Sequence, residues 1–299
     1  MIFIDNTLSK NKIFNFKDIL EARKEFIGLL NFSIDGGAGH GETSKIIAKY
    51  TKKDGKVLAF EPFTGNHKFF EGIDPRIKLI KKALYSKNIF KSFTVSKTVG
   101  KDDEWAQKGL LGYSSLGFID NSSKLKSLIS NSKQILKSFL KPKASFIKPN
   151  KSIVECIRID SIHKQKIDFL KLDLQGGELN ALIGLGNLIS EIEIMWIEFT
   201  GNKKILELIS KNFKLFDTNY MCIGTSADQL EKIGLKVSHN EILSTSVEAN
   251  YAARYKPEKN FIKWFNKAKK KGVIQTDILA INNNLLKKYP NFISHILEL

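Results

Sequence analysis

The sequence has little cysteine and no long apolar run, and both shortages narrow the class of protein. Only Cys156 and Cys222 occur among 299 residues, so the chain has no disulfide framework and no cysteine-based metal-ligand spacing. The five histidines never cluster, which argues against a zinc site. No stretch is apolar enough to cross a bilayer, and the first residues lack a charged leader followed by an apolar segment. These features predict a cytoplasmic protein without a bound metal.

Acidic residues are also scarce relative to basic ones. The chain has 31 Asp and Glu against 48 Lys and Arg, a net charge of +17 and a pI near 9.6. Such a charge attracts phosphates, acidic sugars or nucleic acid. Lysine is abundant throughout while arginine is rare, so a compositional bias explains the charge equally well. With 42% hydrophobic residues, the chain can still bury one large core.

Two basic stretches concentrate this charge. Residues 121–154 contain eight lysines and no acid, with apolar residues near helical spacing. They form either a helix packed on a sheet edge with solvated lysines, or a wall of an acceptor site. Residues 254–271 carry Phe261, Trp264 and Phe265 among lysines. Aromatic residues in such a setting can stack on bases, but this spacing favours a place in the core.

A glycine-rich segment gives the first indication of a ligand. The apolar run that begins at Phe32 ends in Asp35 and is followed by four glycines within six positions, namely Gly36, Gly37, Gly39 and Gly41. Glycine permits positive φ angles and removes the Cβ atoms that would hold a ligand away from the backbone. A strand that turns in this way into a helix is typical of nucleotide-like cofactor sites. The alternative is a turn that serves packing alone.

A second strand, residues 56–62, ends in Glu61, 26 residues after Asp35. In a βαβ unit, an acid at this place lies beside the glycine turn and can accept the hydroxyl protons of a ribose. A solvated acid at the end of an ordinary strand is the other interpretation. The glycine pattern lacks the full G-x-G-x-x-G of dinucleotide sites, so a single nucleoside fits better than NAD.

Two later strands repeat the arrangement of an apolar run that ends in an acid. Residues 167–173 end in Asp173, and residues 193–199 contain Glu198 near their end. The carboxyl ends of parallel strands share one edge of a sheet, where a doubly wound fold binds its ligand. We therefore expect Asp35, Glu61, Asp173 and Glu198 to lie near one another.

The order of elements predicts an α/β fold with a mostly parallel sheet. We expect a helical N-terminal preface over residues 1–30 and one domain over residues 31–299, with irregular insertions at about 91–160 and 217–272. The expected strands lie near residues 31–35, 56–61, 77–82, 167–173, 193–199, 213–217 and 277–282.

The chain resembles the FkbM-type methyltransferases. The blocks that carry the likeness are Ile34–Gly41, Ala59–Pro62, Ile80–Leu84, Tyr113–Leu116, Arg158–Ile162 and Leu170–Glu178, which span roughly residues 30 to 220. The resemblance implies a class I methyltransferase fold, which is Rossmann-like with a seven-stranded sheet, and S-adenosylmethionine as cofactor. It implies cofactor contacts at Asp35, Gly36, Gly37, Gly39, Glu61, Ala83, Ser115 and Asp173. Family members usually have Asn at or near Gly39, and an acid often stands where Gln175 is.

Methyl transfer to a hydroxyl requires alignment of the acceptor and removal of its proton. Asp173 is the leading candidate, either as the base or as a partner of the cofactor's amino group, and Glu198 and His40 follow it. Glu178 either takes part in this chemistry or has a structural role, in which it caps or braces the helix that begins near Gly176. The resemblance favours a hydroxyl acceptor on a sugar, glycan or other small molecule, and the charge favours an anionic one. An RNA ribose methyltransferase and a non-catalytic cofactor-fold protein are the alternatives.

Overall fold

The computed structural model describes residues 16–95, 150–223 and 273–298, together with residues 4, 262, 265 and 266. Ser115 and nearly all of the two basic stretches lie outside the described residues. Phe265 is described, and it is buried with its ring edge-on to Phe199 at a centroid distance of 5.1 Å. This contact agrees with a place in the core for that aromatic residue.

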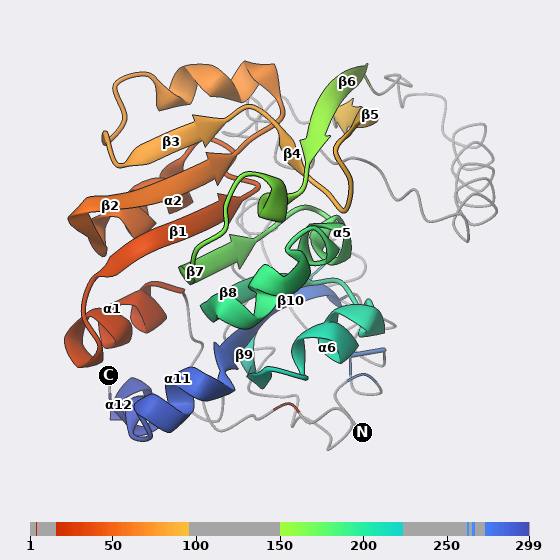
Figure 1. Ribbon diagram of the computed structural model, residues 1–299. Helices are drawn as coiled ribbons and strands as arrows, with labels where there is room; N and C mark the ends of the chain where they lie inside the picture. Colours follow the sequence, from red (N-terminus) through yellow and green to blue (C-terminus); the bar gives the residue numbers. More distant parts are fainter. Residues whose placement is uncertain are drawn as a thin grey trace, which may run out of the picture.

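A seven-stranded sheet forms the centre of the molecule (Figure 1). Five neighbouring strands are parallel, and β10 runs antiparallel to both β8 and β9. Every residue of β7 and β8 is buried, as is typical of strands covered on both faces. In spatial order the strands are β3 (Ile77–Ile80), β2 (Thr51–Phe60), β1 (Leu30–Gly36), β7 (Ile167–Leu172), β8 (Ile192–Phe199), β10 (Val273–Asn282) and β9 (Phe213–Ile223).

Helices cover both faces of this sheet and divide the core into two layers. On one face, α5 (Glu178–Ile183) and α6 (Lys203–Ile209) pack on residues such as Leu170 and Ile197. On the other face, α1 (Phe16–Phe26), α2 (Glu42–Lys49), α11 (Asn283–Lys288) and α12 (Phe292–Glu298) pack on residues such as Phe169 and Trp196. Three 3₁₀ helices join these elements: η1 (Thr64–Phe70), η2 (Ile159–Ser161) and η3 (Gly186–Glu191).

This architecture confirms the expected fold class, a mostly parallel α/β sheet of the class I methyltransferase type. Each of the seven expected strands overlaps one strand of the sheet. The helix α1 also lies within the region expected to be a helical preface.

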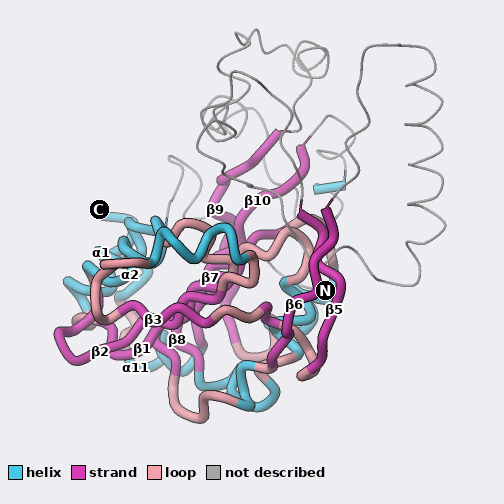
Figure 2. The backbone as a smooth tube through the Cα atoms, turned by 90° about the horizontal axis from the view of Figure 1, so that it is seen from above, coloured by secondary structure: helices cyan, strands magenta, loops and turns pink. Residues whose placement is uncertain are grey.

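A second, three-stranded sheet was not expected from the sequence. It has the order β4 (Ala83–Leu84), β6 (Asn150–Ile157) and β5 (Ile89–Val95), and Figure 2 shows β5 and β6 beside the large sheet as a separate ribbon. Both strands lie at the ends of the stretch that we expected to be irregular. Their period-2 signal is weak because Phe90 and Ile153 are exposed while Phe93 and Val154 are buried, so apolar residues occur on both faces.

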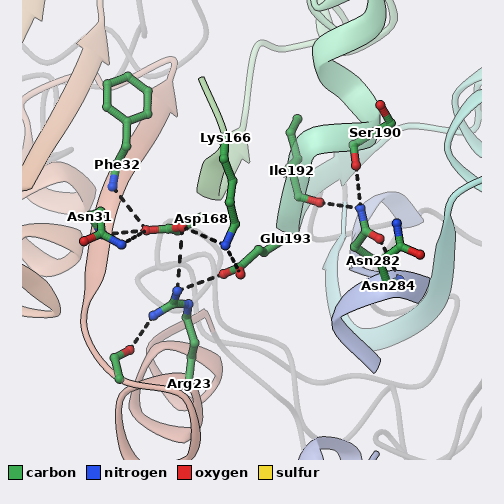
Figure 3. Close-up of polar contacts among 11 residues, drawn as sticks. Arg23, Asn31, Phe32, Lys166, Asp168, Ser190, Ile192, Glu193, Asn282 and Asn284 are labelled. Atoms are coloured by element: carbon green, nitrogen blue, oxygen red, sulfur yellow. Dashed lines mark hydrogen bonds and ion pairs between the residues drawn. The ribbon is translucent and has the colours of Figure 1, made fainter. Parts of the chain in front are cut away.

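A buried ion-pair cluster ties α1 to the end of the sheet where the parallel strands begin (Figure 3). Arg23 of α1 lies 2.8 Å from Glu193 and 3.8 Å from Asp168, and Lys166 pairs with both acids. Asp168 also accepts the backbone N–H of Asn31. Because each buried charge has a partner of opposite sign, the cluster holds the helix and three strands together.

Candidate functional site

The loop between β1 and α2 has the left-handed backbone that its glycines predict. Gly37, Gly39 and Gly41 have φ angles of 79°, 54° and 80°, which residues with a Cβ rarely adopt. The carbonyl of Phe60, at the end of β2, accepts the backbone N–H groups of Gly37 (3.1 Å) and Ala38 (3.0 Å). The ends of the first two strands and the loop therefore form one unit.

The glycines of this loop serve different purposes. A Cβ at Gly37 would lie 1.9 Å from the carbonyl oxygen of Asp173, so the protein itself fills the space there. A Cβ at Gly36 would lie 2.8 Å from Leu172 and 2.9 Å from Leu84. Among the described residues, no atom lies within 4 Å of a Cβ placed at Gly39. Open space beside bare backbone is thus found at Gly39, whereas Gly36 and Gly37 allow neighbouring strands to meet.

Glu61 follows β2 and lies against the glycine loop. Its Oε2 accepts the backbone N–H of Gly39 and its Oε1 that of Phe63, each at 2.8 Å. Burial raises the pKa of Glu61 to about 7, and the hydrogen bonds from Phe63, Gly39 and the side chain of Asn66 act against that rise. The acid that we expected beside the loop is therefore in place, and its charge changes near neutral pH.

Asp35 is completely buried at the end of β1. Ser44 of α2 donates its hydroxyl to Asp35 Oδ2 at 2.6 Å, and the ammonium of Lys171 lies 3.7 Å from Oδ1. Burial raises the pKa of Asp35, while Lys171 and Ser44 oppose this effect. The position makes Asp35 an internal support of the loop, since no part of it reaches the surface.

Lys171 is a buried cation between two of the expected acids. Its Nζ lies 3.4 Å from Asp173 Oδ2 and 3.7 Å from Asp35 Oδ1. Burial lowers the pKa of Lys171, but the negative charges of Asp173, Asp35 and Asp277 raise it by more than burial lowers it. The pKa of Lys171 therefore lies above its ordinary value. The ammonium stays charged and offsets part of the negative charge at this edge of the sheet.

Asp173 directly follows β7 and adjoins the glycine loop, as expected. Its backbone N–H donates to the carbonyl of Gly36 at 3.0 Å. Its side chain is 40% exposed, with Oδ1 accepting from the amide of Gln175 at 2.9 Å and Oδ2 facing Lys171. Asp173 therefore combines a fixed orientation with access to a ligand.

Glu198 lies at the end of β8 in a different environment, with only 2% of the residue exposed. It accepts the backbone N–H of Gln175 at 3.2 Å, and its side chain hydrogen-bonds that of Glu178. Burial, followed by the nearby charges of Asp173, Glu178 and Asp277, raises the pKa of Glu198. A carboxyl that retains its proton is a weak general base, so the geometry favours a positioning role.

Glu178 closes the turn between β7 and α5. Its Oε1 accepts the backbone N–H groups of Leu174 (2.8 Å) and Gly176 (3.0 Å). Of the two interpretations offered by the sequence, these contacts favour the brace.

The remaining expected residues lie around the edge of this group. His40 is half-buried, with its ring edge-on to Phe69 at 4.4 Å, and burial lowers its pKa while a hydrogen bond with Asn66 acts in the opposite direction. Ala83 is buried in β4, next to the leucine that packs on Gly36. His40 is thus grouped with η1, and Ala83 reaches the loop through its neighbour. Ser115 lies outside the described residues.

Asp277 was not among the residues expected at the site, although it lies close to the other acids. It pairs in register with Glu198 and accepts the indole N–H of Trp196 at 2.8 Å. Burial, and then the charge of Asp173, raises the pKa of Asp277 to about 7. Asp277 reaches the site because β10 is antiparallel to β8, so the first residues of β10 lie where the parallel strands end.

In the part of the chain that the structure describes, no group of three or more His, Cys, Asp or Glu side chains is arranged to hold a metal ion. No helix there is both long enough and apolar enough to cross a membrane.

The crystal structure of methyltransferase FkbM from Methylobacillus flagellatus KT is 15% identical over 69% of this chain and 45% of its own, with a TM-score of 0.38. This chain thus spans less than half of that protein. Precorrin-6y C5,15-methyltransferase from Geobacter metallireducens GS-15 is 8% identical over 94% and 100%, with a TM-score of 0.39.

A third similar structure is the plantazolicin methyltransferase BamL, solved with a triazolic desmethylPZN analog and SAH; it is 8% identical over 90% of this chain and 83% of its own, with a TM-score of 0.38. Similarities this low carry no argument about substrate. No curated protein sequence matches the chain. The family profile described as "Methyltransferase FkbM domain" matches residues 35–252, well over half of the chain. The chain therefore belongs to the FkbM methyltransferase family.

Proposed function

We propose that this protein is an S-adenosylmethionine-dependent methyltransferase that methylates a hydroxyl group on a sugar, a glycan or another small molecule. The observation that carries the proposal is the unit formed by Glu61 and the glycine loop. A buried carboxylate accepts the N–H of Gly39, where the backbone has open space on its side-chain face. An acid beside such a turn suits the two hydroxyls of a ribose. Membership of the family supports methyl transfer as the reaction.

The donors and acceptors around this loop fit the cofactor. Each oxygen of Glu61 accepts one backbone N–H group, and a carboxylate oxygen has capacity for a second hydrogen bond. The loop and Glu61 would hold the adenosine end, and the partly exposed carboxylate of Asp173 suits the positively charged end. When bound, S-adenosylmethionine supplies an electrophilic methyl group on a sulfonium sulfur.

The residues of this chain must then orient the acceptor and take its proton. Asp173 is the first candidate, because its carboxylate is oriented by Gln175 and Lys171 yet remains accessible. His40 is the second, since burial lowers its pKa and leaves a neutral ring that can accept a proton. Glu198 ranks third because its environment favours the protonated form.

The charge of the chain supports an anionic acceptor. With a net charge of +17, the protein attracts acidic sugars and phosphorylated molecules over a distance of about one Debye length. A phosphorylated or acidic glycan hydroxyl is therefore the acceptor class that we favour.

Incubation with radiolabelled S-adenosylmethionine and fractionated lysate tests this proposal. We expect label in a sugar or glycan fraction, and Glu61→Ala should reduce it strongly. Glu71→Ala is the control and should leave the label unchanged, because Glu71 is an exposed acid that also follows β2 in the chain. Label in RNA, with activity that falls steeply as salt rises, would replace the acceptor class with RNA ribose. Failure of the folded protein to bind S-adenosylmethionine in calorimetry would overturn the proposal.

A further inference from the structure

Gln175 has an unusual backbone conformation for a residue with a side chain. Its φ angle is 52°, and among the described residues it is the only non-glycine residue with a positive φ. The next residue, Gly176, also has a positive φ of 97°. A glycine at 175 would adopt this conformation without strain, so the contacts of Gln175 must offset the strain that its Cβ introduces.

The contacts of this side chain lead to two acids. Its amide Nε2 donates to Asp173 Oδ1 at 2.9 Å and lies 3.3 Å from Glu198 Oε1. The backbone N–H of Gln175 donates to the other oxygen of Glu198 at 3.2 Å. Glu198 therefore binds the main chain and the side chain of Gln175 together, and stabilises the left-handed conformation.

Glu198 is itself a fixed support. It is almost fully buried, and it lies on a central strand whose residues are all buried. Its partner Glu178 binds the N–H groups of Leu174 and Gly176, on either side of Gln175. The buried carboxyl groups of Glu178 and Glu198 therefore hold the turn at residues 174–176 through its backbone N–H groups.

Asp173 receives its second contact from the opposite side. The ammonium of Lys171 lies 3.4 Å from Oδ2, while Gln175 holds Oδ1. Each carboxylate oxygen thus has one partner, which fixes the plane of the carboxylate, and 40% of the side chain remains exposed.

We propose that Gln175 is a positioning residue, whose amide orients the Asp173 carboxylate and is in turn held by Glu198. The inference rests on the proposed function, because it assigns Gln175 a role through Asp173. It assigns Glu198 to the support of Gln175.

A double-mutant cycle tests this inference. Gln175→Gly removes the amide and relieves the backbone, and Gln175→Ala removes the amide only. The affinity for S-adenosylmethionine is measured by calorimetry, and label transfer is measured at saturating cofactor. Asp173→Asn should lower either the affinity for S-adenosylmethionine or the rate of label transfer. We expect both Gln175 variants to lower the same quantity by about 10-fold or more, as for a lost hydrogen bond to a charged group.

In the Asp173→Asn background, the same Gln175 substitutions should change that quantity less than about twofold, because the residue acts through Asp173. Gln175→Gly should not lower the melting temperature. Gln165→Ala, at an exposed glutamine in the turn before β7, is the matched control and should have no effect.

Three results would overturn the inference. They are a full loss from Gln175→Gly that persists in the Asp173→Asn background, a loss that follows the melting temperature across the variants, and an Asp173→Asn variant that changes neither quantity. Binding of S-adenosylmethionine by the unaltered protein reports separately on the proposed function. A protein that binds the cofactor but shows no coupling between residues 173 and 175 retains the function and loses the inference.

Discussion

At the level of single residues, burial decides which carboxyl groups at the site are charged. Glu61, Glu198 and Asp277 all have raised pKa values for which burial is the largest cause. Lys171 stays charged because carboxylates surround it. The acids at this edge of the sheet therefore need not all carry a negative charge, and they differ in chemical capacity.

The first prediction concerns the pH dependence of cofactor binding through Glu61. Its pKa of about 7 means that the carboxylate, to which we assign the two ribose hydroxyls, is lost as pH falls below 7. We expect the dissociation constant for S-adenosylmethionine to rise up to about tenfold per pH unit below pH 7. Glu61→Gln should bind more weakly at pH 8 and show little pH dependence. Calorimetry between pH 6 and 8 measures both.

The same residue has the opposite effect on the stability of the protein without cofactor. The folded pKa of Glu61 lies above its ordinary value of 4.5, so its stabilising contribution is present below pH 4.5 and is lost as pH rises through about 7. Glu61→Gln should therefore gain stability relative to the unaltered protein between pH 5 and 8. A flat difference in the free energy of unfolding over this range would contradict the raised pKa.

The second prediction separates Asp173 from Glu198. Asp173→Asn should reduce turnover by about 10²–10⁴-fold if Asp173 is the base, or raise the cofactor dissociation constant if it holds the charged end of the cofactor. Glu198→Gln should cost about tenfold or less, because glutamine resembles the protonated acid and its amide oxygen keeps one of the two hydrogen bonds that Glu198 accepts from Gln175. His40→Gln should reduce turnover less than Asp173→Asn does.

Rates measured against cofactor concentration distinguish the two roles of Asp173. Recovery of rate at saturating cofactor assigns Asp173 to binding, and a persistent loss assigns it to proton transfer. Near-normal rates of Asp173→Asn at every concentration would remove this residue from the mechanism.

At the level of elements, the site is formed where β1, β2 and β7 end and their last residues touch. The loop after β1 hydrogen-bonds the end of β2, and Asp173 hydrogen-bonds the end of β1. Glycine is required at these contacts because main chains approach one another closely. A change at one strand end therefore acts on its neighbours.

The third prediction compares Gly37 with Gly39. Gly37→Ala should destabilise the fold by about 3 kcal/mol or more, since its Cβ would lie 1.9 Å from a backbone carbonyl oxygen and its φ is 79°. Gly39→Ala should cost only about 1–2 kcal/mol from the left-handed backbone, because its Cβ meets open space. Urea unfolding measures both costs.

The two variants should also differ in cofactor binding. Gly39→Ala is expected to remain folded and to lose affinity for S-adenosylmethionine, because the new methyl group enters the space assigned to the cofactor. Unchanged affinity in that variant would place the cofactor elsewhere. A Gly37→Ala protein as stable as Gly39→Ala would contradict the close approach of β1 and β7.

At the level of the whole molecule, the two ends of the large sheet have different tasks. The candidate site lies where the parallel strands end, and the ion-pair cluster of Arg23, Asp168, Glu193 and Lys166 lies where they begin. The strands hold the two groups apart, so stability and ligand binding should respond to different substitutions.

The fourth prediction tests this separation at Arg23. Arg23→Met keeps most of the side-chain volume but leaves two buried acids with one exposed lysine, and should cost about 3–5 kcal/mol in the free energy of unfolding. Lys24→Met, in an exposed pair on the same helix, should leave the free energy of unfolding nearly unchanged, because solvent screens exposed ion pairs.

Where Arg23→Met remains folded, its affinity for S-adenosylmethionine should match that of Lys24→Met. Equal stability of the two variants would show that the buried cluster contributes little. A selective loss of cofactor affinity in Arg23→Met would show that the two ends of the sheet are coupled.

The amino-acid pattern alone specifies the strands of the large sheet and the edge at which its acids gather. Apolar runs bounded by glycine and acids identify buried parallel strands, and the ends of such strands must share one edge. Asp35, Glu61, Asp173 and Glu198 were therefore predictable as a group. The β5–β6 ribbon was not, because apolar residues on both of its faces hide the alternation.

The chemical capacity of each acid depends on how the chain folds around it. Asp35 is enclosed, Glu198 is held with Glu178, and Asp173 alone combines two fixed contacts with an accessible carboxylate. These differences depend on burial and on partners far away in the chain, such as Asp277, which reaches the site because β10 runs antiparallel. Local sequence specifies an acid at a strand end, whereas its charge and its orientation depend on the neighbours that folding brings to it.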